Sequence, residues 1–293
     1  MKSKVYFIKD ITSNNLVEIY NKVGKKLKGN IAVKVHSGEK GNQNYLKPEF
    51  LKEIIDYVNG TVVECNTAYS GERNNTLKHK RLISEHGWNK YFKVDILDEE
   101  DNDLELDIPG GKVITKNYIG KNIKNYDSML VISHFKGHPM GGYGGALKQL
   151  SIGLASSRGK AWIHSGGFTK DQDILWDNIC EQDKFLESMA ESALSVVNYF
   201  KDNIVYINIM CNMSVDCDCC AKAEDPCVGD IGILASLDPV AIDQACIDLV
   251  KNSNDSGKEH LLERINSRNG LHTIEVADSI GVGSKEYELI TIE

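Results

Sequence analysis

Short apolar runs alternate with longer amphipathic stretches along most of the chain. Residues 5–8 and 31–35 form apolar runs of the length of buried strands. Residues 14–27 instead place apolar side chains three and four positions apart, which is the helical period, and Pro48 begins a second stretch of this kind. The same pattern predicts further strands at 61–65, 94–97, 113–119, 128–133, 204–210, 231–235, 273–276 and 287–292, and helices at 76–86, 145–156, 184–200, from 238 onward and at 258–266.

The alternation of strands and helices predicts the fold class. Strands separated by helix-length segments require crossover connections, so we expect an α/β fold with a mixed, largely parallel sheet or sheets and flanking helices. Glycine-rich residues 165–169 interrupt the pattern. They divide the chain into an N-terminal half (1–165) with a glycine-rich loop and a C-terminal half (166–293) with a cysteine loop. The halves form either two units or one continuous domain.

The composition of the chain limits the binding partners and the cellular compartment that we expect. The chain has 293 residues, of which 41% are hydrophobic, and a formal net charge of −8, so we expect neither nucleic acid nor a membrane as a partner. The apolar run near the N-terminus is too short for a signal peptide, and no apolar stretch has the length of a membrane span. We therefore expect a cytoplasmic protein, in which the eight cysteines are thiols or metal ligands instead of disulfides.

Polar side chains follow several of the predicted strands. His36 follows one strand, Asn66 and Thr67 follow the next, and His134 and His138 follow the strand at 128–133. Ligands collect beyond the carboxyl ends of strands in open α/β sheets, so we expect these residues to share one site. The three histidines are candidates for proton transfer, and Asn66 and Thr67 are candidates for cofactor binding. The alternative is that these loops are polar only because they are exposed.

The segment 134–148 is rich in glycine and leads into a predicted helix. Glycine allows the backbone to approach a ligand closely, and the positive end of the helix suits a phosphate or carboxylate. The sequence matches neither the Walker pattern nor GxGxxG, so a flavin or another phosphate-bearing cofactor stays open. The alternative is a mobile loop with hydrogen-bonded histidines. The predicted anion-binding residues are Lys136, Gly141, Gly142, Gly144, Gly145 and Lys148.

Five cysteines lie between positions 211 and 227. Thiolates at this density repel one another unless a cation binds them, so the cluster predicts a metal centre. We expect Cys217, Cys219, Cys220 and Cys227 to hold an iron–sulfur cluster or, as the alternative, a zinc ion. The spacing is not the CxxC of ordinary ferredoxins, and a redox-active disulfide or unliganded thiols are further alternatives.

These motifs resemble the family known as domain of unknown function 362, whose members are often described as iron–sulfur proteins. The similar segments are 64–74, 133–160, 216–220 and 230–250, with a looser match at 281–287. Family members commonly carry a ferredoxin-like insert between the glycine loop and the later long helix. Here the corresponding residues, 166–183, contain only Cys180, so the chain resembles a short member without the insert. The resemblance implies that the glycine loop and the Asp-Cys-Asp-Cys loop are site elements, and it supplies no reaction.

The sequence as a whole predicts a metal- or iron–sulfur-binding protein with a redox role, such as an oxidoreductase. It would bind an anionic small molecule or cofactor at the glycine-rich loop, with a redox protein as a second partner. One alternative is a non-enzymatic accessory protein that hands on a metal or cluster. Another is a structural zinc loop beside a phosphate-ligand site.

Overall fold

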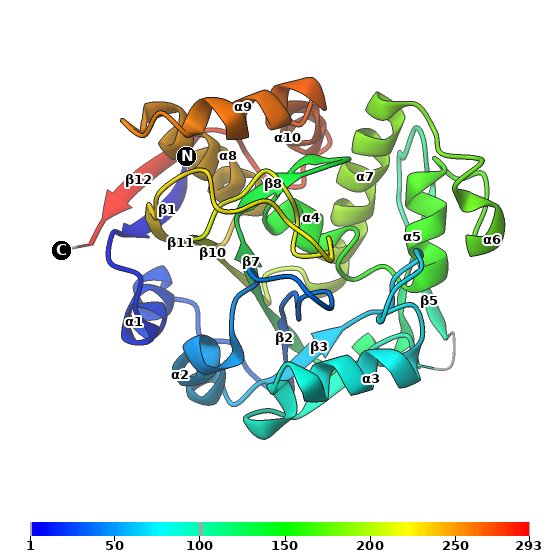
Figure 1. The fold of residues 1–293 in the computed structure, drawn as a ribbon, viewed down its shortest axis with the longest axis horizontal. Coiled ribbons are helices and arrows are strands. Elements are labelled where there is room, and N and C mark those ends of the chain that lie inside the picture. Colours follow the sequence, from blue (N-terminus) through cyan, green and yellow to red (C-terminus); the bar gives the residue numbers. More distant parts are fainter. Residues whose placement is uncertain (1, 100–101, 293) are drawn as a thin grey trace.

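One mixed sheet organises the molecule, which is known from a computed structural model that describes residues 2–99 and 102–292. Its eight strands follow the order β12-β1-β11-β10-β7-β2-β3-β4 (Figure 1). Every neighbouring pair is parallel except the two pairs that contain β11, which confirms the predicted mixed, largely parallel sheet. The strands are β1 (Ser3–Ile8), β2 (Ile31–Lys34), β3 (Thr61–Glu64), β4 (Val94–Ile96), β7 (Ser128–His134), β10 (Ile204–Met210), β11 (Gly232–Ser236) and β12 (Tyr287–Thr291).

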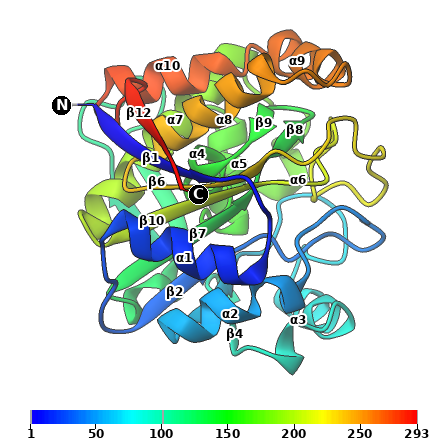
Figure 2. The same ribbon diagram turned by 90° about the vertical axis from the view of Figure 1, so that its left-hand side faces the viewer.

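Helices cover both faces of this sheet (Figure 2). On one face, α1 (Ser13–Val23) and α2 (Pro48–Val58) bury the apolar stripes that their periodicity predicted. Gly24 adopts a left-handed conformation (φ 75°) directly after α1 and ends this helix short of the predicted residue 27. The opposite face carries α4 (Ala146–Leu150), α7 (Gln182–Phe200), α8 (Pro239–Asn252), α9 (Lys258–Ser267) and α10 (Leu271–Ser279).

The remaining elements border the sheet. Two short antiparallel ribbons pair β5 (Asp103–Asp107) with β6 (Lys116–Gly120) and β8 (Lys136–His138) with β9 (Gly142–Gly144). The other helices are α3 (Thr76–Glu85), α5 (Ser157–His164) and α6 (Gln172–Leu175), with short 3-10 turns at Trp88–Lys90 and Lys121–Asn125. Within the described residues, no helix combines the length and apolar character that crossing a membrane requires.

Two sequence-based assignments of secondary structure were wrong. The predicted helix at 145–156 breaks after Leu150, and the chain starts a new helix, α5, where the Ser156 hydroxyl accepts a hydrogen bond from the amide of Gly159. The predicted strand at 273–276 lies inside α10. Thr273 and Ile274 are β-branched, but the buried positions 273, 274 and 277 have the helical spacing.

The two chain halves both contribute strands to the sheet, because β11 of the second half lies between β1 of the first half and β10. The connections diverge between the adjacent parallel strands β2 and β7. From β2 the chain passes through α2 to β3 on one side, whereas β10 follows on the other side of β7. The carboxyl ends of β2 and β7 therefore lie at a topological switch point, where open α/β sheets bind ligands.

Candidate functional site

The cysteine-rich loop, residues 211–231, connects β10 to β11 and packs on the segment that follows β2. The amide of Glu39 donates to the backbone oxygen of Asp218 at 2.9 Å. Side-chain amides of the same segment donate to further carbonyl groups of the loop. These bonds join Asn42 to Cys220, Gln43 to Ala223 and Asn44 to Glu224, each at 2.9 Å. Two polar loops that are far apart in the sequence therefore hold each other in place.

A buried charged cluster anchors the same loop to β7. Nδ1 of His134 lies 2.9 Å from Oδ1 of Asp218, and Nζ of Lys136 donates to Oδ2 at 2.7 Å. Burial opposes ionisation of Asp218, but His134 and Lys136 hold the pKa of its carboxyl well below the usual range. Nε2 of His134 also lies 2.6 Å from the backbone oxygen of Cys211. Both ring nitrogens of His134 therefore face acceptors on the cysteine loop, which gives this predicted proton-transfer residue an anchoring contact.

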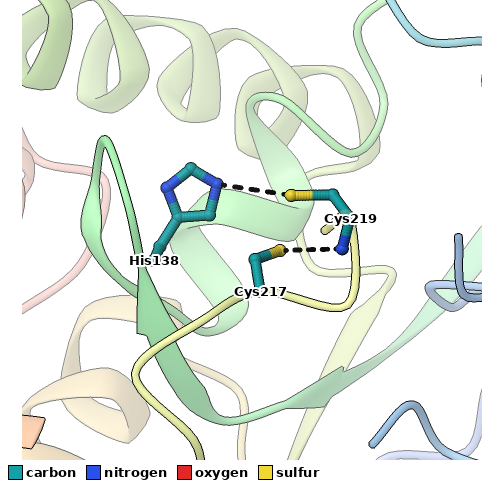
Figure 3. A group of neighbouring side chains, drawn as sticks. All are labelled: His138, Cys217 and Cys219. Carbon is teal, nitrogen blue, oxygen red and sulfur yellow. Dashed lines mark hydrogen bonds between the residues drawn. The ribbon is translucent and has the colours of Figure 1, made fainter. Parts of the chain in front are cut away.

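Three atoms of types that ligate metals converge beside this anchor. The side-chain donor atoms of His138, Cys217 and Cys219 all lie within 4.8 Å of one another (Figure 3). The thiol of Cys217 is buried, and the ammonium group of Lys148 lies 3.6 Å from its sulfur. A group of this composition and size is compatible with metal binding.

The sulfur atoms have unequal proton affinities. Burial opposes ionisation of Cys217, but a hydrogen bond from the Cys219 thiol and the charge of Lys148 hold the pKa of Cys217 well below its usual range. The same hydrogen bond to Cys217, with a second to Cys220, raises the pKa of Cys219. The pKa of Cys220 is lowered by its bond from Cys219. The proton affinity of Cys219 is therefore higher than that of the two neighbouring sulfurs.

His138 has a defined tautomer. Its Nδ1 accepts hydrogen bonds from the backbone amides of Met140 (3.1 Å) and Gly141 (2.8 Å). Burial, with a contribution from Lys148, lowers the pKa of His138 to about 4, so the ring is neutral at pH 7. Its single proton must then reside on Nε2, which lies 3.8 Å from the sulfur of Cys219. The imidazole is thus oriented to donate its proton toward sulfur.

A cavity of about 220 Å³ lies next to the thiols and includes Cys219 and His138 in its wall. Four cationic side chains line it, against one carboxylate, Glu64. Two of the cations are neutralised, because Lys34 pairs with Glu64 at 2.7 Å and Arg73 pairs with Glu39 at 3.2 Å. Within residues 2–99 and 102–292, the other two, Lys148 and Lys160, form no ion pair with a carboxylate. The four cations are Lys34, Arg73, Lys148 and Lys160.

Sequence reasoning missed several cavity residues. Lys34 and Glu64 are charged residues that end the buried strands β2 and β3, and charged side chains are rarely buried without a partner or a role. Lys160 and His164 lie one turn apart on α5, a spacing that places both on one helical face. Burial lowers the pKa of Lys160, and it lowers the pKa of His164 to about 4. These signals were readable in the sequence, although their convergence on one cavity was not.

The predicted glycine loop is positioned by packing inside the protein. Gly142 adopts a left-handed conformation (φ 78°), and a Cβ atom there would lie 2.8 Å from the Cα of Gly270. At the start of α4, the amide of Ala146 donates to Asp243 at 2.7 Å and the amide of Leu147 donates to the same carboxylate at 3.0 Å. The anion at this helix end is therefore a side chain of the chain itself. The described cavity wall contains none of the glycines at 141, 142, 144 and 145.

Of the other predicted site residues, some line the cavity and others do not. His36 and Thr67 line it. Burial and the charge of Arg73 hold the pKa of His36 well below its usual range. Asn66 is buried and donates to Thr76 at 2.9 Å. Cys227 lies outside the three-residue group, and its thiol donates to the backbone oxygen of Met213 at 3.5 Å.

The fold and the site together define a class: an α/β protein with a doubly wound sheet, a thiol cluster and a cationic cavity at the switch point. The chain belongs to the family described as Domain of unknown function (DUF362), whose model matches residues 31–248. A search of curated proteins found no match to the chain.

Two solved structures resemble the fold. One is the lactate racemase apoprotein from Thermoanaerobacterium thermosaccharolyticum, with 15% identity and a TM-score of 0.42; the match covers 70% of this chain and 50% of that one. The other is a Thermotoga maritima protein from a structural genomics consortium, with 9% identity and a TM-score of 0.44; the match covers 91% of this chain and 58% of that one. The chain thus spans between half and three fifths of these proteins.

Proposed function

We propose that this protein binds one metal ion through the thiolates of Cys217 and Cys219, and a small anionic molecule in the adjoining cavity. The observation that carries the proposal is that two cysteine sulfurs lie within 4.8 Å of each other and of Nε2 of His138, at the wall of a cavity with surplus positive charge. The metal would act on the bound anion as a Lewis acid.

The surroundings of Cys217 favour the anionic form that a metal needs, whereas Cys219 would lose its proton when the metal binds. Lys148 and the amide of Cys219 both donate to the sulfur of Cys217, at 3.6 and 3.4 Å. Soft thiolate ligands select zinc, copper(I) or iron–sulfur clusters over magnesium or calcium. Cys220 follows Cys219 directly in the chain but lies outside the group of ligand atoms within 4.8 Å of one another.

In this proposal His138 supports the thiolates without ligating the ion. A histidine that binds a metal through Nε2 carries its proton on Nδ1, but here two amides donate to Nδ1. The proton on Nε2 instead points toward Cys219. Hydrogen bonds of this kind stabilise metal-bound sulfur and orient it.

The arrangement favours a mononuclear ion over a four-cysteine cluster. A cluster held by Cys217, Cys219, Cys220 and Cys227 requires all four sulfurs to converge. The thiol of Cys227 instead bonds to Met213, and the pKa of Cys227 is raised by burial with no contribution from the other cysteines. Zinc is the ion we propose, and an iron–sulfur cluster with a redox role is the competing occupant.

Metal analysis of anaerobically purified protein tests the proposal. We expect close to one zinc per chain and no visible absorption in the wild type and in Cys227→Ser, and little metal in the Cys217→Ser/Cys219→Ser double variant. Cys180→Ser is the matched control, because Cys180 lies outside the thiol group. Sulfide-to-iron absorption that Cys227→Ser abolishes would establish the cluster instead. Full metal content in the double variant would overturn the site.

A second candidate function is dithiol redox chemistry, favoured by the closeness of the Cys217 and Cys219 sulfurs and by the lowered pKa of Cys217. Two thiols would release two electrons and two protons to a disulfide-bearing partner and form one disulfide. Metal-free protein that gains two titratable thiols on treatment with dithiothreitol would support this candidate. Stoichiometric metal in the same preparation would exclude it.

A further inference from the structure

We infer that the ligand of the cavity is amphipathic: an anionic head group joined to an apolar body the size of an aromatic ring. This inference rests on the anion site of the proposed function and adds the chemical class of the rest of the molecule. It follows from the presence of both cationic and apolar side chains in the cavity wall.

The head group belongs near Lys148 and Lys160. These cations line the cavity and, within the described part of the chain, pair with no carboxylate. Both also contribute to the lowered pKa of His164, after burial, so their charges act on the same region of the cavity. The sulfur of Cys217 lies beside Lys148, but no carboxylate among the described residues pairs with Lys160, so an anionic head group would balance its charge.

The apolar body belongs against the apolar side chains of the cavity wall. Met140 and Ile152 line the wall and belong to one apolar cluster, whereas Leu175 packs with Ala68 in another. Trp176 follows Leu175 and remains 45% exposed, although its ring also lines the cavity. An exposed indole at the wall of a cavity offers apolar surface that a ligand can bury.

Trp176 lines the cavity, which distinguishes it from a second exposed aromatic residue nearby, Phe168. Phe168 is 68% exposed and does not line the cavity. The two aromatic residues flank the same short helix, α6, so they form a matched pair: one side chain faces the proposed ligand and the other does not.

Titration calorimetry of the protein as purified tests the inference with three probes: inorganic phosphate, phenyl phosphate and phenol. We expect phenyl phosphate to bind about ten-fold more tightly than phosphate, and phenol to bind far more weakly than phenyl phosphate. Trp176→Ala should weaken phenyl phosphate about five-fold and leave phosphate unchanged, whereas Phe168→Ala should change neither. Lys160→Met should weaken both anions.

The outcomes separate this inference from the proposed function. Equal affinity for phosphate and phenyl phosphate, unaffected by Trp176→Ala, would overturn the amphipathic ligand and leave the anion site standing. Failure of both anions to bind would overturn the anion site itself. If phenol bound as tightly as phenyl phosphate, the ligand would need no anionic head group, and that part of the inference would also be overturned. Circular dichroism of each variant verifies that the fold is retained.

Discussion

The carboxylate of Asp218 lies 2.9 Å from Nδ1 of His134, so a residue between two of the clustered cysteines is tied to the carboxyl end of β7. Lys136 completes the contact at 2.7 Å. The side chain of Asp218 is 1% exposed, and water therefore does little to screen these charges. The position of the thiols depends on a buried ionic anchor that holds the backbone between them.

Replacing Asp218 with asparagine should destabilise the fold by about 3 kcal/mol at pH 7, because Lys136 would lose the charge that balances it in a buried position. The pKa of Asp218 is depressed in the folded protein, so its stabilising effect is present above pH 4 and is lost as the pH falls further. Urea unfolding at pH 7 and at pH 3 should show the difference between wild type and variant shrinking in acid.

Asp216→Asn is the control for this experiment. Asp216 lies in the same loop, but its ion pair with Arg264 is longer, at 3.3 Å, and both side chains are about 20% exposed. We expect a loss below about 1 kcal/mol. Equal losses for the two variants would contradict an anchoring role for Asp218.

Replacing Trp88 with alanine should cost about 3–5 kcal/mol of stability. Its side chain is fully buried, and its Nε1 donates to the backbone oxygen of Ser37 at 3.1 Å. Ser37 follows His36, so the variant should also loosen the segment that contacts the cysteine loop. The half-exposed Trp176 provides the comparison, with an expected loss below about 1 kcal/mol in urea unfolding.

Gly142→Ala should be more destabilising than an alanine at another left-handed glycine. Gly142 and Gly281 have almost the same φ, 78° and 80°, so they share a strain of about 1 kcal/mol. Only at Gly142 would the new Cβ meet backbone, 2.8 Å from Gly270, whereas nothing lies within 4 Å at Gly281. We expect losses of about 3 and 1 kcal/mol in thermal unfolding. Similar losses would mean that the glycine loop tolerates movement.

The fold could be predicted from the sequence more fully than the arrangement of the site. Apolar runs such as those of β7 and β10 are buried along their whole length, and this local signal survives in the tertiary structure. The failure at α10 has a local cause, because four residues that include Thr273 and Ile274 are too short a window to separate a strand from a helix. Packing of α10 against α7 decides the outcome, and this contact joins distant parts of the chain.

The site depends even more on distant contacts. Among the residues predicted for one site, four line a single cavity, namely His36, Thr67, His138 and Lys148, whereas His134 and Asn66 do not. The sequence could not show that the start of α4 is occupied, because Asp243 lies 97 residues from Ala146. Nor could spacing alone show that Cys227 points its thiol toward Met213.

The buried carboxyl of Asp243 leads to a prediction about how the stability of the fold depends on pH. Burial raises the pKa of this carboxyl to about 6, although the amides of Ala146 and Leu147 and the side chain of Asn208 oppose the shift. In the unfolded chain its pKa is about 4. Between these two values the folded protein binds more protons than the unfolded chain, so the contribution of Asp243 to stability falls as the pH rises.

Asp243→Asn removes this titration and isolates its effect. We expect the unfolding free energy of the wild type, relative to the variant, to fall by about 2–3 kcal/mol between pH 4 and pH 7. Urea unfolding of both proteins at each pH measures the difference, in which the other titrating groups cancel. The hydroxyl of Tyr143 is a fourth donor to Asp243, at 3.3 Å. A constant difference would mean that these four donors stabilise the carboxylate as fully as water does, and that the cap of α4 is charged throughout this range.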